Sequence, residues 1–132
     1  MREHPFTVDI DVRYNDVDLL GHVNNAIYSS YLEAARVEYL PEVLGTPESL
    51  ESVLAHLEID FERRIEMGQD VEVTVEVPEL GTSSVPMRYE ITAGGERAAV
   101  AETTLVFLDA QAEDTAPIPD EIRERVVEHE GL

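Results

Sequence analysis

The sequence predicts an α+β fold, in which an antiparallel sheet of about five strands wraps around one long helix. Three observations carry this prediction: an alternating segment over 6–14, a helical pattern over 24–40, and four further alternating segments between 57 and 108. The chain has 132 residues, a usual length for one domain. We therefore expect a single domain over 1–132, with its core in 6–108 and an acidic linker and short helix in 109–132.

The first two elements are a strand and a helix joined by a polar turn. Apolar and polar residues alternate over 6–14, as in a half-buried strand. Apolar side chains then recur every three or four residues over 24–40, which predicts an amphipathic helix about 25 Å long. Asn24 or Asn25 can cap its first N–H groups. Pro41 is expected to end it, because the residue before a proline avoids the α conformation.

The remaining core elements are strands separated by turns. Turns are expected at 67–70, around Gly81 and at Gly94-Gly95, where a tight hairpin needs residues that accept positive φ. The last strand, 97–108, is partly apolar on both faces, which indicates a central position in the sheet. One helix covers one face of such a sheet, so we expect the other surface to be buried by self-association.

Composition restricts the class of protein. The chain carries 9 basic and 29 acidic residues, a net charge of −20, and all its basic residues except histidine are arginine. Such a surface repels nucleic acid, and its self-repulsion falls at high salt, so we expect a halophilic source. No segment approaches the ~20 apolar residues of a membrane span. Without a signal-like N-terminus, the expected location is the cytoplasm.

The polar turn before the long helix first suggests a calcium loop. Asp16 and Asp18 fit its first two acidic positions, but Leu20 and Ile27 stand where two further ligands are needed. The chain has no cysteine and no histidine pair at metal-ligand spacing, so we expect no metal. No phosphate-binding glycine motif is present either.

A carboxylate and an imidazole remain, placed just before a helix start. Free backbone N–H groups at Asn24, Asn25 and Ala26 favour negative charge, so they can stabilise a carbonyl oxygen that becomes an oxyanion. Asp18 can then act as nucleophile or as base for water, with His22 sharing protons. The alternative is structural: Asp18 braces the turn and His22 is a partly buried histidine with its hydrogen bonds satisfied.

The turn and helix closely resemble the signature of hotdog-fold acyl-thioesterases, in the 4-hydroxybenzoyl-CoA thioesterase-like branch with His-Val-Asn-Asn. The resemblance rests on Arg13-Tyr14-x-Asp16-x-Asp18-x-x-Gly21-His22-Val23-Asn24-Asn25-x-x-Tyr28. It continues through Tyr31-Leu32-Glu33-Ala34-Ala35-Arg36, through 56–61 and through the Gly68-Gln69-Asp70 turn. It covers roughly 6–108 and implies a hotdog fold.

The resemblance also implies site residues. It implies that Asp18 is the catalytic carboxylate and that the helix start at 24–26 holds the thioester carbonyl. His22 occupies the position of a functional histidine in related acyl-carrier-protein thioesterases. Those relatives have an asparagine where this chain has Leu20, so their full acid–base set is not carried over. Asp60 aligns weakly with a further carboxylate, and its place in an alternating strand favours a solvated face.

Coenzyme A would bring anionic phosphates to this acidic chain. Its candidate ligands are Arg63, Arg64 and Arg88, because a guanidinium suits phosphate, although each could instead pair with a neighbouring carboxylate. Tyr28, Tyr31 and Tyr39 could line an acyl tunnel, but their helical spacing favours the core.

The resemblance implies an acyl-CoA thioesterase that releases a free acid and CoA without a metal or cofactor, as a homodimer or homotetramer with active sites at subunit interfaces. An acyl-carrier-protein thioesterase and a non-catalytic acyl-thioester-binding module are the alternatives. A hydratase of the same fold is disfavoured, because its Asp-x-Asn-x-x-His spacing is absent.

Overall fold

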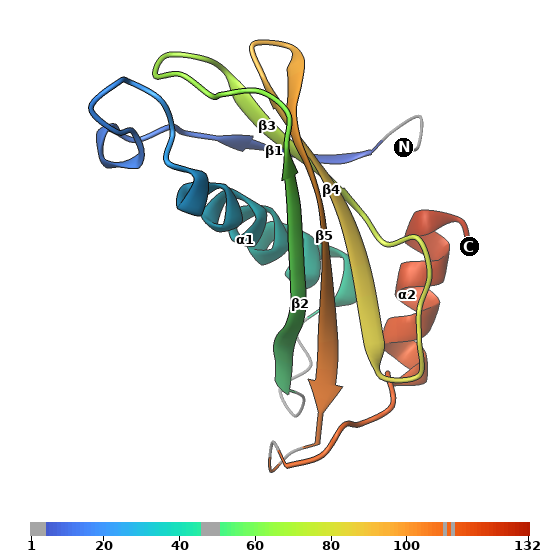
Figure 1. Cartoon of the computed structure of the whole chain (residues 1–132). Helices are drawn as coiled ribbons and strands as arrows, with labels where there is room; N and C mark the ends of the chain where they lie inside the picture. Colours follow the sequence, from blue (N-terminus) through green and yellow to red (C-terminus); the bar gives the residue numbers. More distant parts are fainter. Residues whose placement is uncertain (1–4, 46–50, 110, 112) are drawn as a thin grey trace.

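The computed structural model describes residues 5–45, 51–109, 111 and 113–132 and shows an antiparallel five-stranded sheet with a helix across its inner face (Figure 1). The strand order is β1-β3-β4-β5-β2. The elements are β1 (Phe6–Ile10), α1 (Tyr28–Tyr39), β2 (Glu51–Phe61), β3 (Val71–Glu76), β4 (Ser84–Ala93), β5 (Glu96–Leu108) and α2 (Asp120–Glu130). The α+β architecture predicted from the alternating segments and the single long helix is confirmed.

The core lies between α1 and the inner face of the sheet. Alternate residues of β3, β4 and β5 are buried there, as expected for strands with one covered face. They meet the buried stripe of α1, in which Tyr28, Tyr31 and Tyr39 are at most 4% exposed. The three tyrosines are therefore core residues, as their helical spacing indicated.

The helix differs from prediction at both ends. It begins with a short 3₁₀ turn, Asn25–Ile27, which is capped by Asn24. The Oδ1 atom of Asn24 accepts the Ala26 N–H at 2.9 Å. The prediction that Pro41 ends the helix is wrong, because the chain continues as a π turn over Leu40–Leu44. Pro41 has no N–H to donate to the preceding turn, and the wider π turn accommodates the missing bond. The turn ends at Gly45, whose φ is 78°.

β1 is shorter than the predicted strand. Ile10 pairs with Val71, the first residue of β3, so the residues after Ile10 have no strand beside them. The chain turns instead into a 3₁₀ helix, Tyr14–Asp16, which the side chain of Asp16 closes by accepting the Arg13 N–H. Tyr14, expected at the end of the strand, is 82% exposed.

β5 lies between β4 and β2, as its two-sided apolar pattern predicted. The β4–β5 hairpin turns at Gly94-Gly95, both with positive φ, as expected. β2 pairs with β5 and forms one edge of the sheet. Its side chains Leu54, Leu57 and Phe61 lie opposite buried residues of β5, yet they are 42–49% exposed. This edge therefore presents apolar side chains to solvent.

The C-terminal helix α2 is the short helix expected in 109–132, and the linker before it includes residues 110 and 112, which lie outside the described part. Figure 1 shows α2 beside the loop that joins β3 to β4. Ile122 and Val126 are its buried residues, and Arg123 donates to the Gly81 carbonyl at 2.7 Å. No helix among the described residues has the length and hydropathy needed to cross a membrane.

Candidate active site

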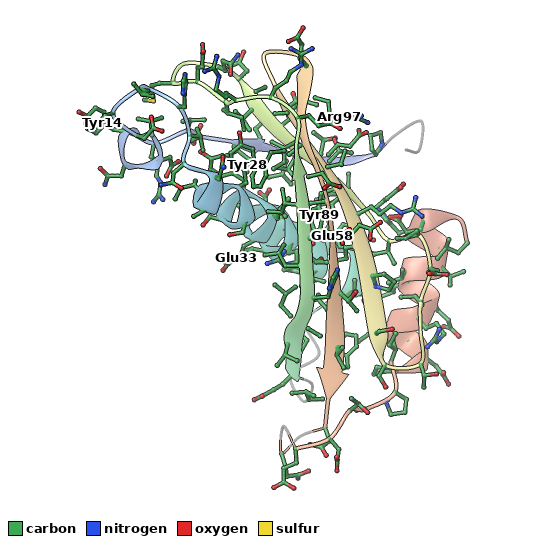
Figure 2. All side chains as sticks on the ribbon, in the orientation of Figure 1. Tyr14, Tyr28, Glu33, Glu58, Tyr89 and Arg97 are labelled. Carbon is green, nitrogen blue, oxygen red and sulfur yellow. The ribbon has the colours of Figure 1, made fainter. Side chains whose placement is uncertain are left out.

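Six of the eight predicted site residues meet in an open cleft of about 570 Å³ between the start of α1 and the end of β2. Two chain segments form its walls: the turn before α1, and the residues that follow β2. Figure 2 labels Tyr28 at this junction, where the first turn of α1 approaches the end of β2. The lining residues are Asp18, His22, Val23, Asn24, Asn25, Tyr28, Phe61, Glu62, Arg63 and Arg64.

The exposed carboxylate of Asp18 is held by the backbone of its own turn. Its Oδ1 accepts the N–H groups of Leu20 at 2.9 Å and of His22 at 3.2 Å. The Asp18 N–H in turn donates to the His22 carbonyl at 2.8 Å, and Gly21 closes the turn with a φ of 80°. Among the described residues nothing donates to Oδ2. One oxygen therefore orients the carboxylate, and the other is available to a bound molecule or water.

At the helix start, two of the three N–H groups expected to bind an oxyanion are already used. The Asn24 N–H donates to the Asp16 carbonyl, and the Ala26 N–H to the side chain of Asn24, both at 2.9 Å. The expectation that all three are free is therefore wrong, because the Asp16 carbonyl and the Asn24 side chain already accept two of them. Within the described chain, the Asn25 N–H is the one of the three without an acceptor.

The neighbouring carboxylate of Asp16 has a different environment from Asp18. Asp16 is 1% exposed and accepts hydrogen bonds from the Arg13 backbone, the Arg13 guanidinium and the Tyr31 hydroxyl. Burial alone would raise the pKa of this carboxyl, but these donors together hold the pKa below its ordinary value. Asp16 is therefore an ionised structural residue that fixes the turn onto α1.

Tyr28 and Phe61 join the two walls of the cleft. Their rings meet edge to face with centroids 4.9 Å apart, and the Tyr28 hydroxyl donates to the Arg63 carbonyl at 3.2 Å. Burial raises the pKa of Tyr28, so the phenol remains a donor. Sequence reasoning missed Phe61 as a lining residue; its signal was its position at the end of a strand, two residues before Arg63-Arg64.

The candidate phosphate ligands divide between two places. Arg63 and Arg64 line the cleft; the Arg63 guanidinium lies 3.4 Å from Glu96, and no described carboxylate pairs with Arg64. Arg88 lies elsewhere, in a hollow of about 250 Å³ on the outer face of the sheet, 3.9 Å from Glu76. The structure does not bring Arg88 to the cleft, because outward side chains of β4 face away from α1.

Asp60 lines the same outer hollow as Arg88, with four glutamates: Glu58, Glu76, Glu90 and Glu102. Its position agrees with the interpretation as a solvated strand residue. No group of three or more histidine, aspartate or glutamate side chains within the described ranges is arranged to hold a metal ion.

Comparisons with known proteins identify the family and the fold of the chain. The model of the thioesterase-like superfamily matches residues 12–126. A thioesterase from Thermus thermophilus, solved with coenzyme A and Zn, is 40% identical and superposes with a TM-score of 0.88, over 100% of this chain and 98% of that one.

Two curated relatives align over most of the chain. The long-chain acyl-CoA thioesterase FadM of Escherichia coli is 26% identical over 123 residues, which cover 89% of this chain and 93% of FadM. A 1,4-dihydroxy-2-naphthoyl-CoA hydrolase of Nostoc punctiforme is 28% identical over 125 residues, which cover 89% of this chain and 83% of that enzyme.

Proposed function

The chain belongs to the thioesterase-like superfamily, and we propose that it hydrolyses acyl-CoA thioesters to a free acid and CoA. Relatives and structural neighbours are named thioesterases, so its class is a thioester hydrolase, as the sequence indicated. The observation that carries the proposal is the cleft itself. It joins a carboxylate with one uncommitted oxygen, a histidine and a free backbone N–H, which are the groups that acyl transfer to water requires.

In the proposed reaction, the thioester carbonyl oxygen accepts the Asn25 N–H, which stabilises the negative charge that develops there. Asp18 Oδ2 either removes a proton from an attacking water or attacks the carbonyl carbon itself, and in the second case water then hydrolyses the anhydride. The C–S bond breaks in both routes. His22 first takes up the proton that water releases, directly or from Asp18, and then passes it to the departing sulfur, so that the products are the acid and the CoA thiol.

Arg63 and Arg64 are the proposed ligands for the phosphates of CoA. Both guanidiniums are exposed at the rim of the cleft, and the surrounding chain is strongly acidic. A guanidinium binds phosphate through two parallel N–H donors, so even one unpaired arginine here provides a favourable anchor. The Thermus relative was solved with coenzyme A, which supports the same ligand class.

We further propose that the enzyme is a homodimer or homotetramer, with β2 at an interface between copies. The exposed edge of β2 carries unpaired backbone groups and apolar side chains, which is unfavourable in water and promotes pairing with another strand. Phe61 ends this strand and Arg63 follows it, and both line the cleft. A second copy paired with β2 would therefore lie beside the cleft.

The test is a hydrolysis assay in high salt with matched acyl-CoA and acyl-carrier-protein substrates over several chain lengths and one aromatic acyl group. Release of CoA thiol at rates that depend on acyl group is expected. Turnover of the carrier-protein substrates alone would favour an acyl-carrier-protein thioesterase. Tight acyl-CoA binding without product would contradict hydrolysis and favour a binding module.

A further inference from the structure

The two walls of the cleft are joined by a short antiparallel bridge in which His22 lies opposite Glu66. Hydrogen bonds flank this pair on both sides: Val23 N–H donates to the Ile65 carbonyl at 2.7 Å, and Met67 N–H to the Gly21 carbonyl at 3.2 Å. His22 and Glu66 are thus a non-hydrogen-bonded pair, the arrangement in which opposite side chains approach most closely.

The turn that follows holds Glu66 in place. The Glu66 N–H donates to Oε1 of Gln69 at 2.9 Å, and the Gln69 N–H donates to the Glu66 carbonyl at 3.3 Å. Gly68 provides the positive φ of 91° that this turn needs. Both backbone polar groups of Glu66 are therefore engaged, and its side chain projects from a fixed point.

The carboxylate of Glu66 faces the imidazole. Oε1 of Glu66 lies 3.9 Å from Nε2 of His22, an ion-pair distance that is longer than a hydrogen bond. The imidazole is 21% exposed and the carboxylate 57%. Catalytic hydrogen bonds are often long in the absence of substrate and shorten when it binds. Glu66 lies beside the cleft, and the charged groups that line the cleft itself are Asp18, Glu62, Arg63 and Arg64.

We propose that Glu66 is a positioning residue for His22, which keeps the proton of the neutral imidazole on Nε2 and leaves Nδ1 as the nitrogen that exchanges protons during hydrolysis. A carboxylate beside one ring nitrogen selects the tautomer with its proton on that nitrogen. The same residue, His22, holds Asp18 through its backbone N–H and meets Glu66 through its ring. The inference rests on the proposed function, in which His22 moves a proton.

The test compares Glu66→Gln with Glu58→Gln. Glu58 forms a similar exposed pair with His56, at 4.0 Å on the outer face of the sheet, so its change removes an equivalent charge away from the cleft. Nitrogen NMR at about pH 8.5, where imidazoles are neutral, should report His22 mainly as the Nε2–H tautomer in the parent protein. In Glu66→Gln the Nδ1–H form should increase, whereas in Glu58→Gln the His22 signals should not move.

Kinetics supply the second measurement. Glu66→Gln should lower kcat about tenfold, which is less than the loss of a general acid or base itself, because Glu66 acts only through His22. KM for acyl-CoA should be unchanged, and Glu66→Asp should recover part of the loss. An unchanged His22 tautomer, or an unchanged kcat, would overturn the proposal. The tautomer is measured without substrate, so it tests Glu66 separately from the proposed function, which fails only if the parent protein does not hydrolyse thioesters.

Discussion

The Tyr31 hydroxyl donates a hydrogen bond of 2.9 Å to Oδ2 of Asp16, and this contact separates the roles of the two aspartates in the turn. Burial and the bond to Asp16 both raise the pKa of Tyr31, so the phenol stays protonated and donates. Asp16 is committed to α1 and to Arg13, whereas Asp18, two residues later, keeps one oxygen uncommitted in the cleft.

Asp16→Asn should lower the free energy of unfolding by about 2 kcal/mol, because hydrogen bonds to a buried charged group are lost. The pKa of Asp16 in the folded protein lies below its ordinary value of 3.8. The stabilising effect of the ionised carboxylate is therefore complete above pH 3.8, and it is lost as the pH falls through the pKa of the folded state. Urea unfolding should therefore show a large difference between the variant and the parent at pH 6 and a smaller one near pH 3. A constant difference over this range would contradict the assignment.

Asp18→Asn should reduce kcat at least a hundredfold, as expected for loss of a general base or nucleophile. The amide oxygen can still accept the Leu20 and His22 N–H groups, so thermal stability should stay close to that of the parent. Asp60→Asn is the control, since Asp60 faces the outer hollow. Near-normal turnover in the Asp18 variant would remove this residue from the mechanism.

Arg64→Ala should raise KM for acyl-CoA by about threefold to tenfold with a smaller change in kcat, because the lost contact is a charge-assisted bond to an exposed phosphate. Arg125→Ala is a matched control. Its side chain is also exposed and has no carboxylate partner within the described residues, but it lies on α2. Steady-state kinetics at low and high salt should show the effect for Arg64 alone. Equal effects of the two variants would indicate general electrostatics.

Leu57→Glu should dissociate the proposed oligomer, because it places a charge on the exposed apolar side of β2. Val127→Glu adds the same charge to α2 and should leave the assembly intact. Sedimentation velocity at micromolar concentration distinguishes the two. An unchanged sedimentation coefficient for Leu57→Glu would mean that β2 is not the interface.

Molar KCl should raise the melting temperature of the parent protein by several degrees. The net charge of −20 makes the folded chain repel itself, and a Debye length of about 3 Å at 1 M salt removes most of that repulsion. Scanning calorimetry between dilute buffer and 3 M KCl measures the shift. A melting temperature independent of salt would argue against a halophilic source.

Regular patterning made most of the fold predictable. The alternating valines of β3 and the glycine pair of the Gly94-Gly95 hairpin are signals that can be read from adjacent residues, and they predict the strand and the turn. The ends of β1 and α1 have no such local signal, because they depend on residues that are distant in sequence. β1 stops where β3 begins, and Pro41 is accommodated in a π turn that a period of 3.6 residues does not describe.

The candidate site was predictable in part for the same reason. Asp18, His22 and the helix start are close in sequence, and the structure places them in one cleft with Arg63 and Arg64. Whether an N–H group is free depends on the position of an acceptor in space, and the sequence does not reveal that the N–H groups of Asn24 and Ala26 are already bonded. The separation of Arg88 likewise depends on which face of β4 it occupies.

The bridge between His22 and Glu66 also has a consequence for folding. It joins two wall segments that are far apart in sequence, and closing so long a loop costs chain entropy that its two flanking hydrogen bonds cannot repay. The cleft can therefore assemble only after β2 has paired with β5 and brought the second wall into position. On refolding, helix content should return before the ability to turn over substrate does.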